Sequence, residues 1–352
     1  MKFFAILGLI VGMPLLALTG PVQKEFIFTS APFVSCHAST LVELRSGGLL
    51  AAWFGGREEG APDVAIWASR RVGSQWSIPF ELVREPDVPT WNPVLFYTRD
   101  GRLWLYYKFG FSPETWAAGR RWSVDDGKTW SAPEHLPAGL YGPIRAKPLV
   151  LDDGTIVSGT SVEGYHTWAA WIERSIDAGA TWSRIGPITV PRPSKAQSAQ
   201  QAPAGSGREE KVYGIIQPSI VPLGSKHLRL YARSTALIGK ICVADSFNAG
   251  ATWTQARPLE LPNPDSGIDA LALHDGRVVL AFNNSQHNRT PLNLAVSKDG
   301  EHFRVFLTLE DQPGEYSYPA LIQSQDGSLR ITYTWNRRRI CYVRVPLASV
   351  PE

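Results

Sequence analysis

The sequence predicts an all-β chain folded as a six-bladed β-propeller, and two repeated signals carry that prediction. One is an octet of the form Ser-x-Asp-x-Gly-x-Thr-Trp. The other is a turn built on Gly, usually Asp-Gly, followed by an apolar run. Six such turns lie near residues 48, 101, 154, 225, 276 and 327, spaced 53, 53, 71, 51 and 51 residues apart. Asp-Gly between apolar runs is typical of a hairpin, because Gly accepts the positive φ that a tight turn needs.

The spacing of these turns defines a repeating unit of about fifty residues. A unit of this length with several short strands, none able to bury its faces alone, is typical of a four-stranded propeller blade. The longer interval contains residues 191–211, which are rich in Pro, Ser, Ala, Gln and Gly and predict a flexible insertion. The early run "KEFIFTS" is expected to join the last blade and so remove an exposed sheet edge.

The residues of the octet are those of a stabilised turn, so we expect the octet to mark the fold and to have no catalytic role. Its Ser and Asp side chains can bond neighbouring backbone amides, its Gly permits a tight path, and its Trp is expected to pack between blades. Clear, shortened or worn copies begin at Ser69, Ser123, Ser175, Ser246 and Ser297.

The N-terminus has the plan of a secretory signal. Lys2 precedes the apolar run "FFAILGLIVGMPLLAL", and small residues follow. We expect a signal peptide over residues 1–22, a propeller over residues 25–350, and a monomeric protein that is secreted or periplasmic. An uncleaved N-terminal anchor is the alternative, although Pro14 and the modest length disfavour a membrane-spanning helix.

Composition excludes several classes of function. A net charge of +3 is too small to indicate nucleic acid or an anionic membrane as partner, and the run Arg337–Arg339 fits a solvated strand end. Cys36, Cys242 and Cys341 fit buried small residues, with one disulfide as the alternative. Without a CxxC or Cys/His cluster, no metal or cofactor is expected.

The segments between the octets carry a family resemblance over nearly the whole predicted propeller. The segments are "AAWFGGREEGAPDVAIW", "WNPVLF", "GPIRAKPLVLDDGTI", "IQPSIVPL", "LPNPDSGIDAL", "RTPLNLAVSKDG" and "GEYSYPALIQ". They resemble the sialidase-like propellers, in particular the bacterial group described as predicted neuraminidases, and the octets resemble the Asp boxes of that fold. The resemblance implies an exo-glycosidase. Sialidases of this fold bind the substrate carboxylate with three arginines, and use a Tyr nucleophile assisted by a Glu, and an Asp as acid/base. A phenol suits attack on an anomeric centre that already bears a carboxylate.

Five residues match the family's functional positions. Asp63 matches the acid/base, and Arg57, six residues before it, matches a substrate contact. Arg233 and Arg289 match two members of the arginine triad, and Tyr318 matches the nucleophile. Glu315, three residues before Tyr318, is a candidate activating base or sugar-binding group.

Two positions depart from the family pattern. His37 stands where the first triad Arg is expected, and His cannot make the bidentate fork that Arg makes to a carboxylate. Gln217 stands where the Glu partner of the Tyr is expected, and an amide cannot accept a phenol proton. His37 is alternatively an acid/base itself. Further polar candidates expected in loops on the same face, or able to add charge there, are Lys147, Asn92, Glu163, Asp265, Asp269 and Asn284.

Three hypotheses of function follow. The first is a secreted exo-glycosidase of the sialidase type that removes a terminal acidic sugar from glycoconjugates. The second is a glycosidase of the same fold that acts on another terminal sugar, such as a uronate or a deoxy sugar. The third is a carbohydrate-binding propeller without turnover. The first is favoured over the third by the retained residues Arg57, Asp63, Arg233, Arg289 and Tyr318. The second is favoured over the first by His37 and Gln217.

Overall fold

The computed structural model describes residues 20–192 and 212–352 as an array of β-sheets. The predicted signal peptide and the predicted insertion therefore lie largely outside the described residues. Within those residues the only helical element is the 3-10 turn η2 (Leu347–Ser349), so the all-β prediction is confirmed. The described part also contains no helix with the length and apolar character needed to cross a bilayer.

Hydrogen bonding joins the strands into five sheets. The first contains β2 (Ser35–Glu43), β3 (Leu49–Gly56), β4 (Ala65–Val72), β5 (Gln75–Trp76) and β6 (Phe80–Val83). The second contains β7 (Thr90–Tyr97), β8 (Leu103–Phe109), β9 (Ala117–Ser123) and β10 (Glu134–His135). The third contains β11 (Leu149–Val150), β12 (Ile156–Glu163), β13 (Thr167–Ser175), β14 (Ser183–Ile188), β15 (Tyr213–Pro222), β16 (Leu228–Ser234), β17 (Lys240–Ser246) and β18 (Arg257–Pro262).

The remaining strands form the last two sheets. The fourth contains β19 (Asp269–Ala272), β20 (Val278–Asn283), β21 (Leu292–Ser297) and β22 (Arg304–Glu310), and the fifth β23 (Tyr316–Gln323), β24 (Leu329–Trp335), β25 (Arg339–Val345) and β1 (Gln23–Phe26). As predicted, the early strand joins the last sheet, because β1 pairs antiparallel with β25 from Gln23 opposite Arg344 to Phe26 opposite Cys341.

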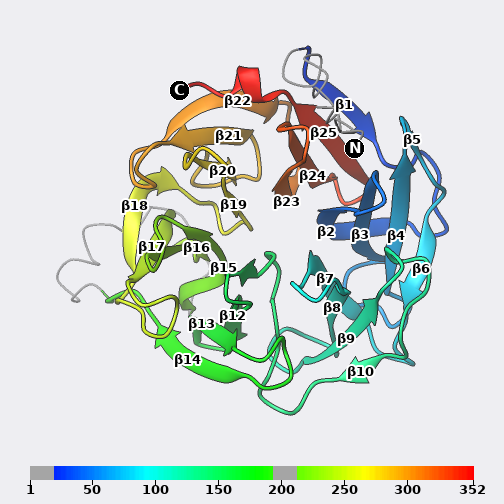
Figure 1. Ribbon diagram of the computed structural model, residues 1–352, viewed down its shortest axis with the longest axis horizontal. Helices are drawn as coiled ribbons and strands as arrows, with labels where there is room; N and C mark the ends of the chain where they lie inside the picture. The colour runs from blue at the N-terminus through cyan, green and yellow to red at the C-terminus, as the bar shows by residue number, and fades with distance from the viewer. Residues whose placement is uncertain (1–19, 193–211) are drawn as a thin grey trace, which may run out of the picture.

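The sheets succeed one another around a common centre. Figure 1 shows β2, β7, β12, β15, β19 and β23 nearest to that centre. Nearly all strand pairs are antiparallel; the exception is a short parallel pair between β13 and β15, which joins the two halves of the third sheet. The six predicted turns link β2 to β3, β7 to β8, β11 to β12, β15 to β16, β19 to β20 and β23 to β24. The glycines at 48 and 101 have φ values of 83° and 92°, as the hairpin prediction requires.

The octets close turns through their own side chains. Ser123 Oγ accepts a hydrogen bond from the Gly127 amide at 2.8 Å, and Asp125 Oδ1 accepts one from the Thr129 amide at 2.9 Å. Trp130 packs against the core between the first two sheets. The octet that begins at Ser175 repeats these bonds, as does the one at Ser246 with Asn248 in place of the Asp. The prediction of a structural marker is confirmed for these copies.

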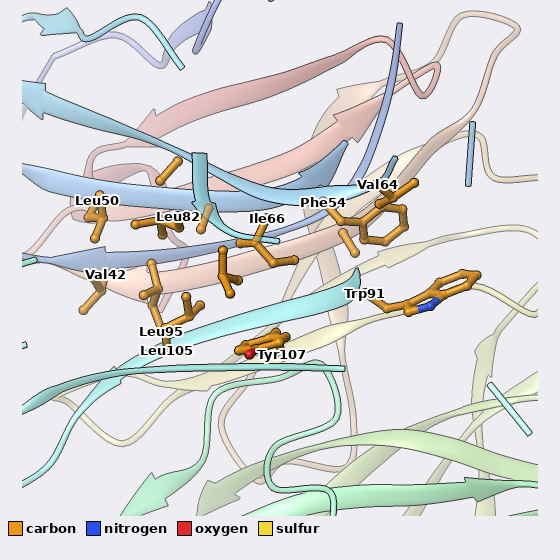
Figure 2. Packing of buried hydrophobic residues seen from close by; sticks show 14 of the residues in the cluster. Val42, Leu50, Phe54, Val64, Ile66, Leu82, Trp91, Leu95, Leu105 and Tyr107 are labelled. Atoms are coloured by element: carbon orange, nitrogen blue, oxygen red, sulfur yellow. The ribbon is translucent and has the colours of Figure 1, made fainter. Parts of the chain in front are cut away.

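The core consists of layers between neighbouring sheets. Along β3 the side chains alternate between two layers, with Leu50 and Phe54 in the layer shared with the second sheet and Leu49 and Trp53 in the layer shared with β25. Figure 2 shows the first of these layers, where Leu50 and Ile66 face Leu95 and Leu105. Because neighbouring sheets cover both faces of β3, its sequence is apolar along the whole strand and does not alternate with polar residues. Each fully buried Leu or Ile contributes about 1.5–3 kcal/mol relative to an exposed one.

The three cysteines are buried and unpaired. Burial raises the pKa of the Cys242 thiol to about 12, so that the thiol stays protonated. The prediction of small buried residues is confirmed, and the alternative of a disulfide is wrong.

Candidate active site

Four of the innermost strands carry a β-bulge at the same place. The pairing register shifts between His37 and Thr40 in β2, between Trp91 and Val94 in β7, between Ile216 and Ser219 in β15, and between Ser317 and Ala320 in β23. Inside each bulge one residue other than Gly has a left-handed backbone. These residues are Ala38, Asn92, Gln217 and Tyr318, with φ values of 53°, 37°, 55° and 53°. Bulges re-aim side chains, and a bulky residue at positive φ is uncommon outside strained functional sites.

Tyr318 lies at the middle of a hydrogen-bonded cluster. Its phenol oxygen lies 2.7 Å from Nη1 of Arg233 and 3.3 Å from Nε2 of Gln217, and Arg233 Nη1 also reaches Gln217 Oε1 at 3.4 Å. All three side chains are buried, with Tyr318 8% exposed. Since β15, β16 and β23 belong to two different sheets, the fold brings these residues together across the centre.

His37 packs on the same tyrosine. The two ring centroids are 4.3 Å apart, and His37 Nδ1 is 3.0 Å from Thr334 Oγ1. Burial lowers the pKa of His37 well below its ordinary value, and four nearby arginine charges lower it further. The imidazole is therefore neutral at physiological pH. A neutral ring cannot supply the positive charge of the arginine that the family pattern has at this position.

Three guanidinium groups surround the Tyr318 ring. Those of Arg145, Arg233 and Arg289 lie 5.4, 5.8 and 5.7 Å from its centroid. Arg233 and Arg289 are predicted from the sequence, whereas Arg145 is not; it is buried and donates to the carbonyl oxygens of Ile268 and Pro319. Arg145 lies in the segment "GPIRAKP", which is among the segments that carry the family resemblance.

Lys147, the residue selected from that segment, makes a different contact. Its Nζ lies 3.0 Å from Asp269 Oδ2, and the same carboxylate accepts hydrogen bonds from the Leu321 amide and the Ser219 hydroxyl. Asp269 begins β19 and is buried, and Asn92 lies within β7, so the expectation that these two residues lie in loops is wrong. Asn92 lies in the bulge of β7, whereas Asp269 pairs with Ala281 in the regular ladder between β19 and β20. Asn284 is exposed just after β20.

Carboxylates hold the arginines in place. Asp265 Oδ1 accepts a hydrogen bond from Arg233 Nε at 2.7 Å. Glu315 accepts one from Arg289 Nη1 and one from Arg337 Nε, both at 2.9 Å. Although burial raises the pKa of Glu315, these two arginines outweigh it and keep that pKa below the ordinary value. Glu315 is therefore a weak base near neutral pH.

Arg337 corrects an interpretation of the sequence. The run of three arginines predicts a solvated strand end, but Arg337 is half-buried and forms ion pairs with Glu315 and Glu59. Only the next residue, Arg338, is exposed as expected. Composition alone could not show that the β24–β25 turn reaches the candidate site.

Arg57 and Asp63 lie in the loop between β3 and β4. Both are exposed, and Asp63 Oδ2 accepts a hydrogen bond from the Arg57 amide at 2.9 Å. Arg84 Nη1 donates to the Asp63 carbonyl oxygen at 2.7 Å. Glu59, in the same loop, ties it to the cluster around Tyr318 through its ion pair with Arg337.

Glu163 is a buried carboxyl group on the border of the cluster. It ends β12, 8% exposed, and Ser161 Oγ is 3.5 Å from its Oε1. Burial raises the pKa of Glu163 to about 7, even though Arg233 opposes the shift. Its partner in the β12–β13 register, Trp168, stacks on the Arg233 guanidinium, 5.4 Å from the ring centroid. Glu163 therefore exchanges a proton in the neutral range beside Arg233.

A pocket of about 390 Å³ opens next to the Arg289–Glu315 ion pair. It is lined by His287, Asn288, Arg289, Thr290, Pro313, Gly314 and Glu315. Within residues 20–192 and 212–352, no three His, Cys, Asp or Glu side chains are grouped so as to hold a metal ion.

Known proteins resemble this chain in sequence pattern and in fold. The family model of the BNR repeat-like domain matches residues 47–331. No curated protein sequence matches the chain. A protein of unknown function from Dyadobacter fermentans has a similar structure, with a TM-score of 0.73 and 16% identity over 92% of this chain and 98% of that one.

Two sialidases of known structure are also similar. The NanB sialidase from Streptococcus pneumoniae superposes with a TM-score of 0.71 and 14% identity, over 93% of this chain and 71% of that one. The Trypanosoma rangeli sialidase, solved with the inhibitor DANA, has a TM-score of 0.69 and 13% identity, over 92% of this chain and 59% of that one. At these identities the likeness shows a common fold.

Proposed function

This chain belongs to the BNR repeat-like domain family. From that premise we propose that it is a glycoside hydrolase, and that it removes a terminal acidic sugar of the sialic acid type from glycoconjugates. The observation that carries the proposal is the buried phenol of Tyr318, hydrogen-bonded by Arg233 and surrounded by three guanidinium groups. A nucleophile with this much positive charge around it suits a substrate that brings a carboxylate.

Each group has a part in the proposed reaction. The arginines bind the sugar carboxylate, and the Tyr318 oxygen forms a bond to the anomeric carbon while the glycosidic bond breaks. Asp63, exposed on the neighbouring loop, gives its proton to the departing oxygen. The phenol proton needs an acceptor other than Gln217, and Glu163, whose pKa is about 7, is the carboxyl group suited to that exchange. In a second step water attacks the anomeric carbon while Asp63 accepts a proton from it; the bond to Tyr318 breaks, the free sugar leaves, and Glu163 returns the proton to the phenolate. In the alternative, a water oriented by Tyr318 attacks the anomeric carbon directly.

One observation favours a second substrate class. His37 and Gln217 occupy positions where sialidases have a charged Arg and Glu, so recognition and proton transfer differ from the sialidase pattern. A terminal uronate, which also carries one carboxylate, is the alternative substrate.

We further infer the architecture and location that this function needs. The strands group into six sets that fit blades of about fifty residues, with the β13–β15 pair as a contact between two neighbours. These sets are β2–β6, β7–β10, β11–β14, β15–β18, β19–β22, and β23–β25 with β1. The plan of residues 1–22 supports export to the periplasm or the medium, and we expect a monomer.

Hydrolysis of 4-methylumbelliferyl α-N-acetylneuraminide by the purified protein tests the proposal. Turnover by the wild type that falls at least about 100-fold in Tyr318→Phe and Asp63→Ala would support it. Tyr97→Phe is the matched control, because that phenol bonds Asp126 in an octet, away from the candidate site. A folded wild type without turnover rejects a sialidase, and release of uronic acid from oligosaccharides would then identify the alternative.

A further inference from the structure

The geometry points to Arg337, in the turn between β24 and β25, as the carboxylate-binding arginine that replaces the one missing at position 37. The inference rests on the proposed function and refines its substrate to a sugar with a single negative charge.

The turn that carries Arg337 is fixed on both sides. Asn336 and Arg337 both have left-handed backbones, with φ values of 49° and 53°, as the two central residues of a type I′ turn require, and the Arg338 amide donates to the Trp335 carbonyl oxygen at 3.0 Å. Asn336 exchanges hydrogen bonds with the backbone of Glu315, and the Arg337 carbonyl oxygen accepts one from the Cys36 amide at 2.8 Å. The turn is thereby docked on β2 one residue before His37.

The guanidinium group of Arg337 shares a carboxylate with Arg289. One oxygen of Glu315 accepts from Arg337 Nε and the other from Arg289 Nη1, each at 2.9 Å. Two guanidinium groups that share one carboxylate lie close together, and Arg289 already borders the Tyr318 ring. Arg337 is also the foremost of the four arginine charges that lower the pKa of His37, which agrees with a place near the imidazole that packs on Tyr318.

A charge count indicates the kind of ligand. Four guanidinium groups, of Arg145, Arg233, Arg289 and Arg337, face three ion-paired carboxylates, of Asp265, Glu315 and Glu59. Among Arg145 and these ion-paired groups one guanidinium group is in excess, and a sugar monocarboxylate neutralises it. Without Arg337 the excess disappears. An Arg also offers a planar fork for bidentate binding that His37 and a Lys lack.

A purely structural role for Arg337 predicts a different result. If Arg337 only held Glu59 and Glu315 in place, its loss would weaken charged and uncharged sugars alike. If it binds the substrate carboxylate, its loss would weaken only the charged sugar.

Calorimetric titration of the full chain separates these cases. The probes are N-acetylneuraminic acid and D-glucuronic acid, each beside its uncharged methyl ester. The proteins are the wild type, Arg337→Gln, Arg337→Lys and, as matched control, Arg338→Gln, an exposed neighbour in the same hairpin. We expect Arg337→Gln to weaken acid binding about 10- to 100-fold and leave ester binding unchanged, as loss of a charged hydrogen bond predicts. Arg337→Lys should lie between, and Arg338→Gln should match the wild type.

The outcomes are distinct. If Arg337→Gln keeps the wild-type preference for acid over ester, Arg337 does not bind the carboxylate, whereas the proposed function stands. If the folded wild type binds neither acid, the proposed function fails and this inference with it. Equal losses for acid and ester in Arg337→Gln assign it a structural role and overturn the inference.

Discussion

The Nη1 atom of Arg233 lies 2.7 Å from the phenol oxygen of Tyr318, and the two side chains come from different sheets. Arg233 is buried and its other side is fixed by Asp265. Burial alone would lower the pKa of Arg233, but Tyr318 and Asp265 raise it above the ordinary value, so the guanidinium stays charged. The phenol therefore has a fixed position beside a permanent cation.

Arg233→Lys tests this relationship. Lys cannot reach Tyr318 and Asp265 at once with a planar fork, so kcat/KM should fall about 100-fold while the fold persists. The measurement is steady-state hydrolysis of the acidic glycoside together with a thermal melt. Arg99→Lys, an exposed arginine paired with Asp152, is the control and should keep full activity. Equal activity of the two variants would contradict the role of Arg233.

Gln217→Glu should restore a proton acceptor beside the phenol. Gln217 Nε2 is 3.3 Å from the Tyr318 oxygen, and a carboxylate there could accept the phenol proton. We expect kcat to rise about tenfold and to acquire an acidic limb where the new carboxyl titrates. A pH–rate profile of both proteins measures this. A folded variant that is slower at every pH would contradict this gain and leave Glu163 as the acceptor of the phenol proton.

The buried carboxyl of Glu163 should make stability depend on pH. Its pKa is raised from an ordinary 4.5 to about 7, so the folded chain binds this proton more tightly than the unfolded chain. The contribution of Glu163 to stability is therefore intact below about pH 4.5 and is lost as pH rises from there to about 7. We expect the fall in melting temperature between pH 5 and pH 8 to shrink by several degrees in Glu163→Gln. Glu260→Gln, at an exposed position, should show the wild-type fall; an unchanged fall in Glu163→Gln would contradict the raised pKa.

Asp125→Ala should affect folding and leave substrate binding intact. Asp125 bonds the amide and hydroxyl of Thr129 within an octet and has no contact with the Tyr318 cluster. We expect the melting temperature to fall by a few degrees, while the dissociation constant for the acidic sugar below that temperature stays within about twofold. Lys128→Ala, exposed in the same octet, should change neither. Altered binding at full stability would give the octet a role in chemistry.

The repeated pattern predicted the fold well because it is local. Asp-Gly turns and octets determine their own geometry within a few residues, as the bonds of Ser123 and Asp125 show. The pairing of "KEFIFTS" with the last sheet was also predictable, because an unpaired edge strand is a liability.

The candidate site was harder to predict because it is assembled across sheets. The resemblance located His37, Gln217, Arg233 and Tyr318, which the structure brings into contact. It did not locate Arg337, whose place depends on how one hairpin turn meets β2. A local signal for the bulges did exist, because the residues at 92, 217 and 318 each precede a proline.

The antiparallel pairing of β1 with β25 has a consequence for how the molecule is made. Gln23 is among the first residues of the described chain, yet its strand partner is Arg344. During synthesis the outer edge of the final sheet cannot form until the ribosome has released the chain as far as Arg344. That sheet therefore stays incomplete while the other sheets are being made, and loss of β25 would leave β1 without a partner.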